Sequence, residues 1–309
     1  MTTLVRSFVL ALVLGAALLP AAAAQANSNQ ASIMMDDDLL VYRDDSTAAK
    51  TLTQMKSLGV DTVRVTVLWS VVAENAKFSK AEISKLPKKF RAAAQKQSRR
   101  FKAINPKTYP TRNWDRYDNL VKSAQDQGIR IYFNITGPGP AWAHEAPPKA
   151  LSRFRRTWKP RASAFKQFVT AVGRRFGGAY RDENADRGIL PRVSFWSLWN
   201  EPNQGGWLAP QWERRGSRTV AASPGLFRKL HQSGYRGLLA SGHSVARDTV
   251  LLGETAPLGS NQKTGKAPMR PALFLRELAR SGRLVPTGTP TTRTRRTSRR
   301  TSATRTPTR

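Results

Sequence analysis

Residues 199–203 have side chains that could perform acid–base chemistry. The segment reads Trp-Asn-Glu-Pro-Asn and follows the apolar, aromatic stretch 193–198. Apolar neighbours disfavour the charged form of a carboxyl group, and a protonated carboxyl is what cleavage of a glycosidic bond needs at the leaving oxygen. Asn200 can hydrogen-bond a sugar hydroxyl, and Pro202 stiffens the turn. A structural alternative stays open, in which Glu201 caps the next helix and Pro202 only ends the strand.

Related residue types stand at the ends of other predicted strands. They are Asp36–Asp38, Trp69, Asn134 with the loop 137–142 that contains Trp142, and Glu254. Carboxylates and amides bind hydroxyl groups, and indole rings cover the apolar faces of a sugar ring. No glycine-rich phosphate loop follows the first predicted strand, which argues against a nucleotide site. This set of side chains therefore favours a carbohydrate ligand.

Composition excludes several other chemistries. The chain has no cysteine, so it has no disulfide, no thiolate zinc site and no cysteine nucleophile. Its three histidines, His144, His231 and His243, form no close-spaced pair. We therefore expect no metal and no cofactor.

Strand and helix patterns alternate between the two ends of the chain. Apolar and β-branched runs predict strands at 33–35, 60–69, 129–135, 193–200 and 249–252. Apolar residues at helical spacing predict helices over 48–55, over 114–124 with Asn113 as N-cap, over 165–176, after Ser223-Pro224, and over 268–278. Five such units imply a parallel sheet with right-handed crossovers. Length alone does not choose between a doubly wound sheet and a (β/α)8 barrel.

These motifs resemble the retaining (β/α)8 glycoside hydrolases of clan A, the cellulase-like families 5 and 39 among them. Residues 199–203 are similar to the clan's acid/base motif on strand four, residues 63–65 to its strand-two stretch, and residues 137–143 to its strand-three loop. Residues 253–257 resemble a strand-five element of cellulase-like proteins. The resemblance implies that Glu201 is the catalytic acid/base, that Asn200 binds substrate and that Arg64 orients the nucleophile. With the strand ends it gives a substrate-binding set of Asn200, Arg64, Trp69, Asn134, Trp142 and Glu254.

One part of the clan's pattern is missing. A retaining hydrolase needs a second carboxylate about 5–5.5 Å from the first, and in this clan it comes from strand seven. The carboxylates after Glu201 are Glu213, Asp248, Glu254 and Glu277. Glu277 lies in a predicted amphipathic helix. Glu254 is expected to contact substrate, and two alternatives stay open for it: a structural hydrogen bond, or the role of nucleophile if a neighbouring strand end aims it at the same anomeric carbon. We therefore expect an incomplete (β/α)8 TIM-type barrel of about five β–α units without the nucleophile, poorly soluble or molten because of its unpaired edge.

The two ends of the chain differ from the middle. Residues 1–26 have the basic, apolar and Ala-x-Ala parts of a signal peptide, which predicts a secreted protein without a membrane span after its removal. Residues 283–309 form a Thr- and Arg-rich tail that we expect to be disordered and that out-of-frame translation would also produce. Residues 27–282 form the partial catalytic domain, with a basic insertion at about 77–110 that we expect to be a solvated loop.

The leading hypothesis is thus a secreted glycoside hydrolase of a polysaccharide or oligosaccharide, with impaired activity. A carbohydrate-binding protein without turnover is an alternative. The formal charge of +32 keeps a third one open, a basic adhesion protein for anionic cell-wall polymer. Few aromatic residues interleave the basic insertion, so we expect no nucleic-acid partner. Oligomeric state and the identity of the glycan are left open.

Overall fold

The computed structural model describes residues 30–184 and 188–282. The chain divides into two units, Met1–Ser32 and Ile33–Arg309, and the description below concerns the second. The predicted signal peptide, residues 1–26, and the predicted tail, residues 283–309, lie outside the described residues. None of the described helices has the length and apolar character needed to cross a membrane.

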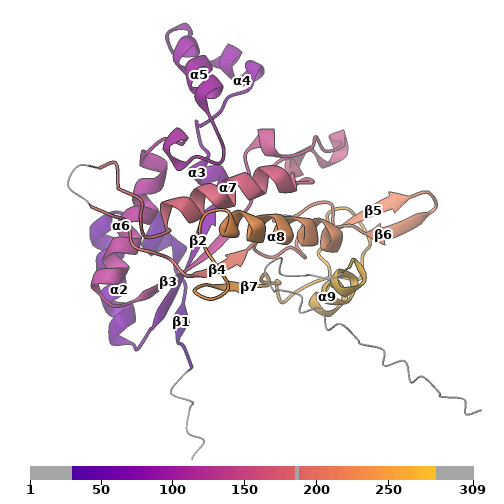
Figure 1. Ribbon diagram of the computed structural model, residues 1–309. Coiled ribbons are helices and arrows are strands. Elements are labelled where there is room, and N and C mark those ends of the chain that lie inside the picture. Colours follow the sequence, from indigo (N-terminus) through magenta and orange to yellow (C-terminus); the bar gives the residue numbers. More distant parts are fainter. Residues whose placement is uncertain (1–29, 185–187, 283–309) are drawn as a thin grey trace, which may run out of the picture. The chain divides into compact units, whose positions relative to one another are not determined.

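The centre of the unit is a five-stranded parallel sheet with the strand order β1-β2-β3-β4-β7 (Figure 1). Its strands are β1 (Ile33–Met34), β2 (Thr62–Leu68), β3 (Arg130–Thr136), β4 (Phe195–Leu198) and β7 (Thr249–Leu251). The spatial order follows the chain order, so right-handed crossovers put every connecting helix on the same face. A doubly wound sheet would reverse its order at a switch point. The fold is therefore a singly wound, incomplete barrel of the (β/α)8 type, open at β1 and β7 among the described strands.

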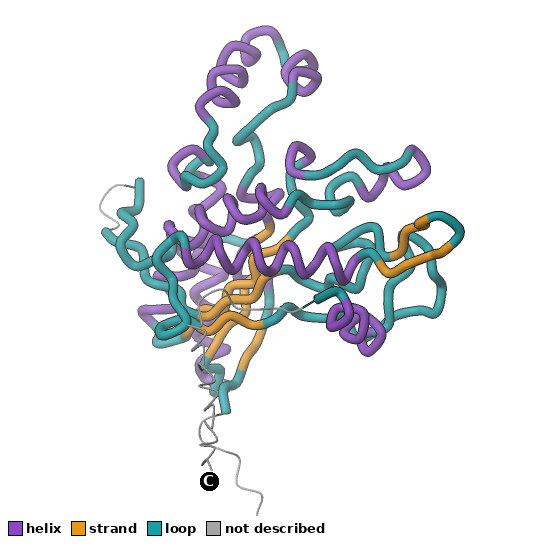
Figure 2. The backbone as a smooth tube through the Cα atoms, turned by 45° about the vertical axis from the view of Figure 1, so that its right-hand side comes forward, coloured by secondary structure: helices purple, strands orange, loops and turns teal. Residues whose placement is uncertain are grey.

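Helices follow each strand of the sheet. The longer ones are α2 (Asp45–Ser57), α5 (Lys88–Arg100), α6 (Arg112–Asp126), α7 (Ala162–Arg175), α8 (Ser223–Leu239) and α9 (Pro271–Arg280). The shorter ones are η1 (Asp38–Tyr42), α3 (Trp69–Val72), α4 (Lys80–Lys85), η2 (Pro106–Thr108), η3 (Ala141–Ala143) and η4 (Lys149–Phe154). The helices α7 and α8 run side by side along the sheet (Figures 1 and 2).

Alternation along the strands separates an apolar face from a polar one. In β2, the side chains of Val63, Val65 and Val67 are fully buried in the same core cluster as the apolar residues of the helices. Successive side chains of a strand point to opposite faces, so Arg64 and Thr66 face the other way. In β3 and β4 the same alternation separates two sets: Ile131, Phe133, Ile135, Trp196 and Leu198 pack in the core, and Tyr132, Asn134 and Ser197 lie opposite. The face away from the helices is thus polar.

Two helix starts differ from the prediction. Helix α6 begins at Arg112 with Thr111 as its N-cap residue. Asn113 is buried instead, and its Nδ2 donates to the carbonyl oxygens of Val72 at 3.0 Å and Glu74 at 2.7 Å. At α8, Ser223 is the first helical residue, and its hydroxyl donates to Gln211. Both polar side chains tie their helix to another part of the chain, a role that local sequence does not reveal.

The basic insertion is helical, whereas the sequence predicted a loop. It forms α4 and α5, and α4 starts with a capping box made by Ser79 and Glu82. Ala94 is the one buried residue of the two helices. Because these helices project into solvent, they have no apolar face, and the usual helical pattern of apolar residues is missing.

A β-hairpin between β4 and α8 was also missing from the prediction. Its strands are β5 (Trp212–Arg215) and β6 (Arg218–Ala221), paired antiparallel and joined at Gly216, whose φ is 61°. Trp212 is buried and anchors the hairpin to the core. The hairpin's charged residues hide its strand pattern in the sequence.

Candidate active site

Glu254 is the centre of a polar cluster on the face of the sheet away from the helices. Arg64 lies 2.7 Å from its Oε2 through Nε and 2.6 Å through Nη2. The hydroxyl groups of Tyr132 and Ser197 donate to Oε1, and Asn134 Nδ2 donates to the same oxygen at 3.1 Å. The carboxylate therefore joins side chains from β2, β3 and β4.

Strand register explains why these side chains meet. Arg64 is paired with Tyr132, and Asn134 is paired with Ser197. Residues opposite each other in neighbouring strands share one face, so alternate positions of three strands converge. Ser197 is in turn paired with Leu251, which lies three residues before Glu254.

Charge and burial at Glu254 act in opposite directions. Burial by itself raises the pKa of this carboxyl, but the hydrogen bonds from Arg64, Ser197 and Tyr132 outweigh it and hold the pKa below its ordinary value of 4.5. Burial, with the hydrogen bond to Glu254 next, raises the pKa of Tyr132, so its phenol stays a donor. At neutral pH the cluster contains an ionised Glu254.

Glu201 lies on a strained turn next to this cluster. The φ angles of Trp199 and Glu201 are 78° and 39°, a left-handed conformation that costs a non-glycine residue about 1–3 kcal/mol. Backbone hydrogen bonds hold the turn: Trp199 N donates to Ile135 O at 2.9 Å, and Glu201 N donates to Glu254 O at 2.8 Å. Strain of this kind is concentrated at functional sites in proteins.

The side chains of Asn200 and Glu201 differ in their hydrogen bonding. Asn200 Oδ1 accepts from Arg64 Nη2 at 2.9 Å, which joins Asn200 to the Glu254 cluster. The half-buried Glu201 carboxylate has no hydrogen bond or ion pair within the described part of the chain. The two glutamates thus follow neighbouring strands. Glu254 accepts hydrogen bonds with both carboxylate oxygens, whereas the Glu201 carboxylate accepts none from the described residues.

The two tryptophans expected to line the cleft are in different places. Trp69 is the first residue of α3 and is fully buried, with its ring stacked on Phe168 at a centroid distance of 5.4 Å. The prediction that Trp69 contacts substrate is therefore wrong, because α3 turns the ring into the core. Trp142 stays partly exposed, with its ring against the edge of Trp69. A Cβ at Gly139 would lie 2.8 Å from the Trp69 ring, so the loop needs a glycine there.

The structure adds residues that the sequence analysis did not single out. Tyr132 and Ser197 complete the Glu254 cluster, and they lie two and three residues from Asn134 and Asn200. Period-two alternation from those positions would have found Tyr132. Asp37, one of the three predicted aspartates, accepts from Thr66 N at 2.9 Å and joins the end of β1 to β2.

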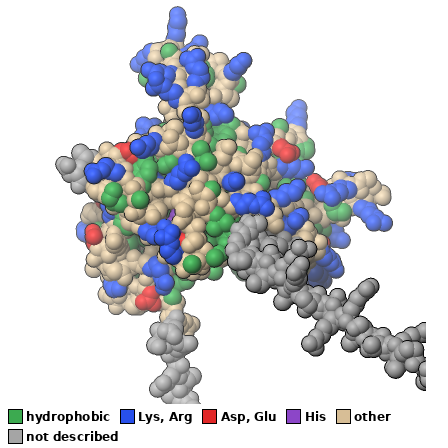
Figure 3. Space-filling view, in the orientation of Figure 1, with side chains coloured by type: hydrophobic (Ala, Val, Ile, Leu, Met, Phe, Trp, Pro, Cys, Tyr) green, Lys and Arg blue, Asp and Glu red, His purple; other side chains and the backbone are tan. Residues whose placement is uncertain are grey.

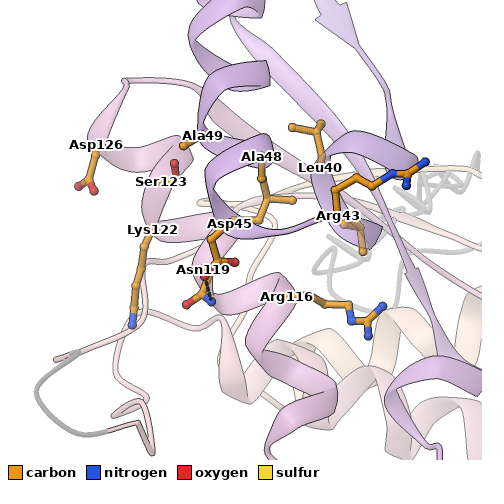
Figure 4. Close-up of a pocket in the computed structure, with 12 residues that line it drawn as sticks. Leu40, Arg43, Asp45, Ala48, Ala49, Arg116, Asn119, Lys122, Ser123 and Asp126 are labelled. Atoms are coloured by element: carbon orange, nitrogen blue, oxygen red, sulfur yellow. Dashed lines mark hydrogen bonds between the residues drawn. The ribbon is translucent and has the colours of Figure 1, made fainter.

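Two cavities lie in different parts of the unit. One, of about 740 Å³, is at the carboxyl ends of the strands. It is lined by Leu68, the last residue of β2, by Pro138 after β3 and by Gly206 after β4. The other, of about 280 Å³, lies between η1, α2 and α6 among mixed charges (Figure 4). Only the first opens where the strand ends gather. Among residues 30–184 and 188–282, no three His, Cys, Asp or Glu side chains are grouped so that they could hold a metal ion.

No protein-family model matches the sequence, and no curated protein matches it. The structure is similar to glycoside hydrolases of solved structure. The endo-1,4-β-mannanase from Rhizomucor miehei has a TM-score of 0.42 at 13% identity, over 79% of this chain and 64% of the mannanase. GH5_18 from Streptomyces cattleya has a TM-score of 0.38 at 15% identity, over 71% of this chain and 44% of GH5_18. A family 1 β-glucosidase from Thermotoga maritima has a TM-score of 0.37 at 13% identity, over 65% of this chain and 35% of the glucosidase.

The chain spans less than two thirds of the length of each of these three structures. Because their TM-scores are below 0.5, these similarities carry no argument about function, which has to be argued from the residues of the site.

Proposed function

We propose that this chain carries a glycoside hydrolase site in which Glu201 is the general acid/base. One observation carries the proposal: an unengaged carboxylate stands on a strained strand-end turn beside a second carboxylate that is fully hydrogen-bonded. Paired carboxyl groups in contrasting environments are the arrangement with which glycosidases separate a proton donor from an anion. In this role Glu201 protonates the glycosidic oxygen as the bond to the sugar breaks.

Asn200 and Arg64 position the sugar in this proposal. Because Asn200 Oδ1 accepts from Arg64, its Nδ2 is left to donate to a sugar hydroxyl. Arg64 is itself held by Glu254. Glu254 therefore acts as an anionic anchor that fixes both side chains, and it contacts substrate from the floor of the site.

We also propose that turnover by this chain is low. Hydrolysis with retention of the anomeric configuration needs a second carboxylate about 5–5.5 Å from the acid/base. The described sheet has five parallel strands, and the seventh barrel strand, which supplies this carboxylate in the clan A enzymes that the sequence resembles, is not among them. Asp36, Asp37, Asp38 and Glu254 follow described strands and each accepts a hydrogen bond, so each would have to share or give up that bond to act as the nucleophile. Export from the cell, with residues 1–26 removed, belongs to the same proposal.

The test is cleavage of a panel of 4-nitrophenyl glycosides by the wild-type protein and by E201Q. General acid–base catalysis contributes about 10²–10⁴-fold in rate, so E201Q should lose about that factor while still binding the sugar. E277Q is the matched control, because Glu277 pairs with Arg280 on α9, away from the sheet. Equal sugar binding without cleavage by wild type and E201Q would indicate a carbohydrate-binding protein instead.

A further inference from the structure

Three arginines line the cavity at the carboxyl ends of the strands. Arg153, Arg155 and Arg156 are exposed, and they border the cavity of about 740 Å³ together with Leu68 and Pro138. No Asp or Glu is among the described residues that line it, and none of the three guanidinium groups has an ion pair among them. This cavity therefore holds cationic charge that the described chain does not neutralise.

Hydrogen bonds tie the arginine segment to two of the loops that follow the sheet strands. Gly139 N, in the loop after β3, donates to Arg156 O at 3.0 Å. The hydroxyl of Thr157 donates to the carbonyl oxygen of Gly205 at 3.1 Å, in the loop after β4 that contains Glu201. The arginine segment is thus tied to the loop that contains Trp142 and to the loop that contains Asn200 and Glu201.

The cavity also offers apolar surface beside the charges. Phe154 lines it, and the Arg153 guanidinium lies 4.8 Å from the centre of the Phe154 ring. Arg156 lines a second cavity of about 310 Å³ as well, where Lys77 lies 5.3 Å from the centre of the Trp142 ring. Two acidic residues, Glu74 and Glu82, border that second cavity. Basic side chains and aromatic rings therefore stand together in both cavities.

Charge on the rest of the surface has the same sign. Lys and Arg side chains gather over the projecting α4 and α5 (Figure 3). This excess speeds the approach of polyanions of any kind, whereas the cavity selects among them. The planar fork of arginine matches a carboxylate with two parallel hydrogen bonds.

We propose that the substrate of this site is a carboxylated polysaccharide, a chain of uronic acids, whose carboxylates pair with Arg153, Arg155 and Arg156. The inference rests on the proposed function, because it names the substrate class of the same site. It adds that negative charge on the sugar chain contributes to binding.

The experiment measures the affinity of E201Q, which binds without turnover, for three probes by titration calorimetry. The probes are a hexamer of galacturonic acid, the same hexamer after reduction of its carboxyl groups to alcohols, and a single-stranded DNA hexamer. We expect the acidic hexamer to bind about tenfold or more tightly than the neutral one, since exposed ion pairs contribute about 1.5- to 5-fold each. The triple variant R153Q/R155Q/R156Q should remove that difference.

The matched control is R218Q/R236Q/R276Q, which removes the same charge at exposed positions on β6, α8 and α9 and should keep the difference. Equal affinity for the acidic and the neutral hexamer would overturn the inference and leave the hydrolase proposal standing. Tighter binding of the DNA hexamer, or an equal loss in the control variant, would overturn it too. If neither hexamer binds, the inference fails, and cleavage of the 4-nitrophenyl glycosides still decides the hydrolase proposal.

Discussion

Two glutamates illustrate how neighbours decide what a carboxyl group can do. Glu254 accepts hydrogen bonds from four side chains, and its side chain is 24% exposed. Glu201 lies one strand away, where its backbone donates to Glu254 but its carboxylate has no partner among the described residues. The sequence pattern pointed to Glu201 for chemistry. The structure shows that Glu254 organises the surroundings of that chemistry.

The backbone strain at Glu201 predicts that a glycine at this position makes the protein more stable but inactive. At a φ of 39°, replacing Glu201 by glycine removes a left-handed penalty of about 1 kcal/mol, and no side-chain hydrogen bond is lost with it. We expect E201G to raise the free energy of unfolding by about that amount while abolishing cleavage. Urea denaturation of wild type, E201G and E201A checks this, and E201A should show no gain. A destabilised E201G would mean that the turn is not strained.

The lowered pKa of Glu254 predicts a pH-dependent loss of stability. A carboxyl whose pKa is lower in the folded than in the unfolded chain stabilises the fold fully above the unfolded value, 4.5 here, and ceases to do so as the pH falls through the folded value. We expect E254Q to cost about 3 kcal/mol at pH 7, because Arg64 is then left without its anion. The gap to wild type should shrink below pH 4.5.

Urea denaturation between pH 3 and 7 measures that gap. E277Q, which breaks an ion pair whose Arg280 partner is largely exposed, should cost less than about 1 kcal/mol throughout. A gap between E254Q and wild type that is the same at pH 3 as at pH 7 would contradict the assignment of an ionised Glu254.

At the scale of elements, the insertion and the sheet differ in how much of each is buried against the rest of the protein. The strands β2, β3 and β4 are buried on their helix side, whereas α4 and α5 bury only Ala94. One of the hydrogen bonds that hold the projection, Gln97 Nε2 to Thr108 O at 2.9 Å, lies at its base. The two helices therefore depend on local hydrogen bonds and on a few contacts near their ends.

Amide hydrogen exchange tests this difference. Segments with few buried contacts open locally at low free-energy cost, so the amides of α4 and α5 should exchange at least about 10²-fold faster than those of α6 and α7. F101A, at the end of α5 where Phe101 packs against Tyr109 and Trp142, should speed exchange in α5 and leave α7 unchanged. Equal protection of α5 and α7 in wild type would show that the insertion is part of the core.

The sequence indicated these elements to unequal degrees. All five sheet strands were predicted within a few residues, because runs such as Val63-Arg64-Val65 are β-branched and buried. The predicted Arg64, Asn134, Asn200 and Glu254 do meet in one cluster. The burial of Trp69 and the helices of the insertion depend on tertiary packing, which a strand or helix pattern does not contain.

At the scale of the whole unit, the sheet is open at β1 and at β7 within residues 30–184 and 188–282. The edge strands and the residues after them carry exposed apolar side chains, Ile33, Met34 and Met35 at β1 and Leu251 and Leu252 at β7, each 38–54% exposed. Unpaired edges of a sheet invite pairing with other chains. The high positive charge counters association but does not cover these edges.

The open edges predict a poorly soluble protein. We expect the wild-type protein to associate through these edges and to bind the dye ANS there, because their apolar side chains are exposed. Charged substitutions at the exposed edges, M34K with L251K, should reduce aggregation relative to L258K, a substitution at an exposed leucine outside the edges. A wild-type protein that stays monomeric at high concentration and binds no ANS would contradict this expectation.

The central claim, proton donation by Glu201, is tested most directly by how the defect of E201Q depends on the leaving group. Wild type and E201Q are compared on aryl glycosides that range from 2,4-dinitrophenol to unsubstituted phenol. The account predicts a loss of only a few-fold with dinitrophenol, which leaves without a proton, rising to about 10³-fold with phenol. A loss of the same size on every substrate, or no loss at all, would contradict it.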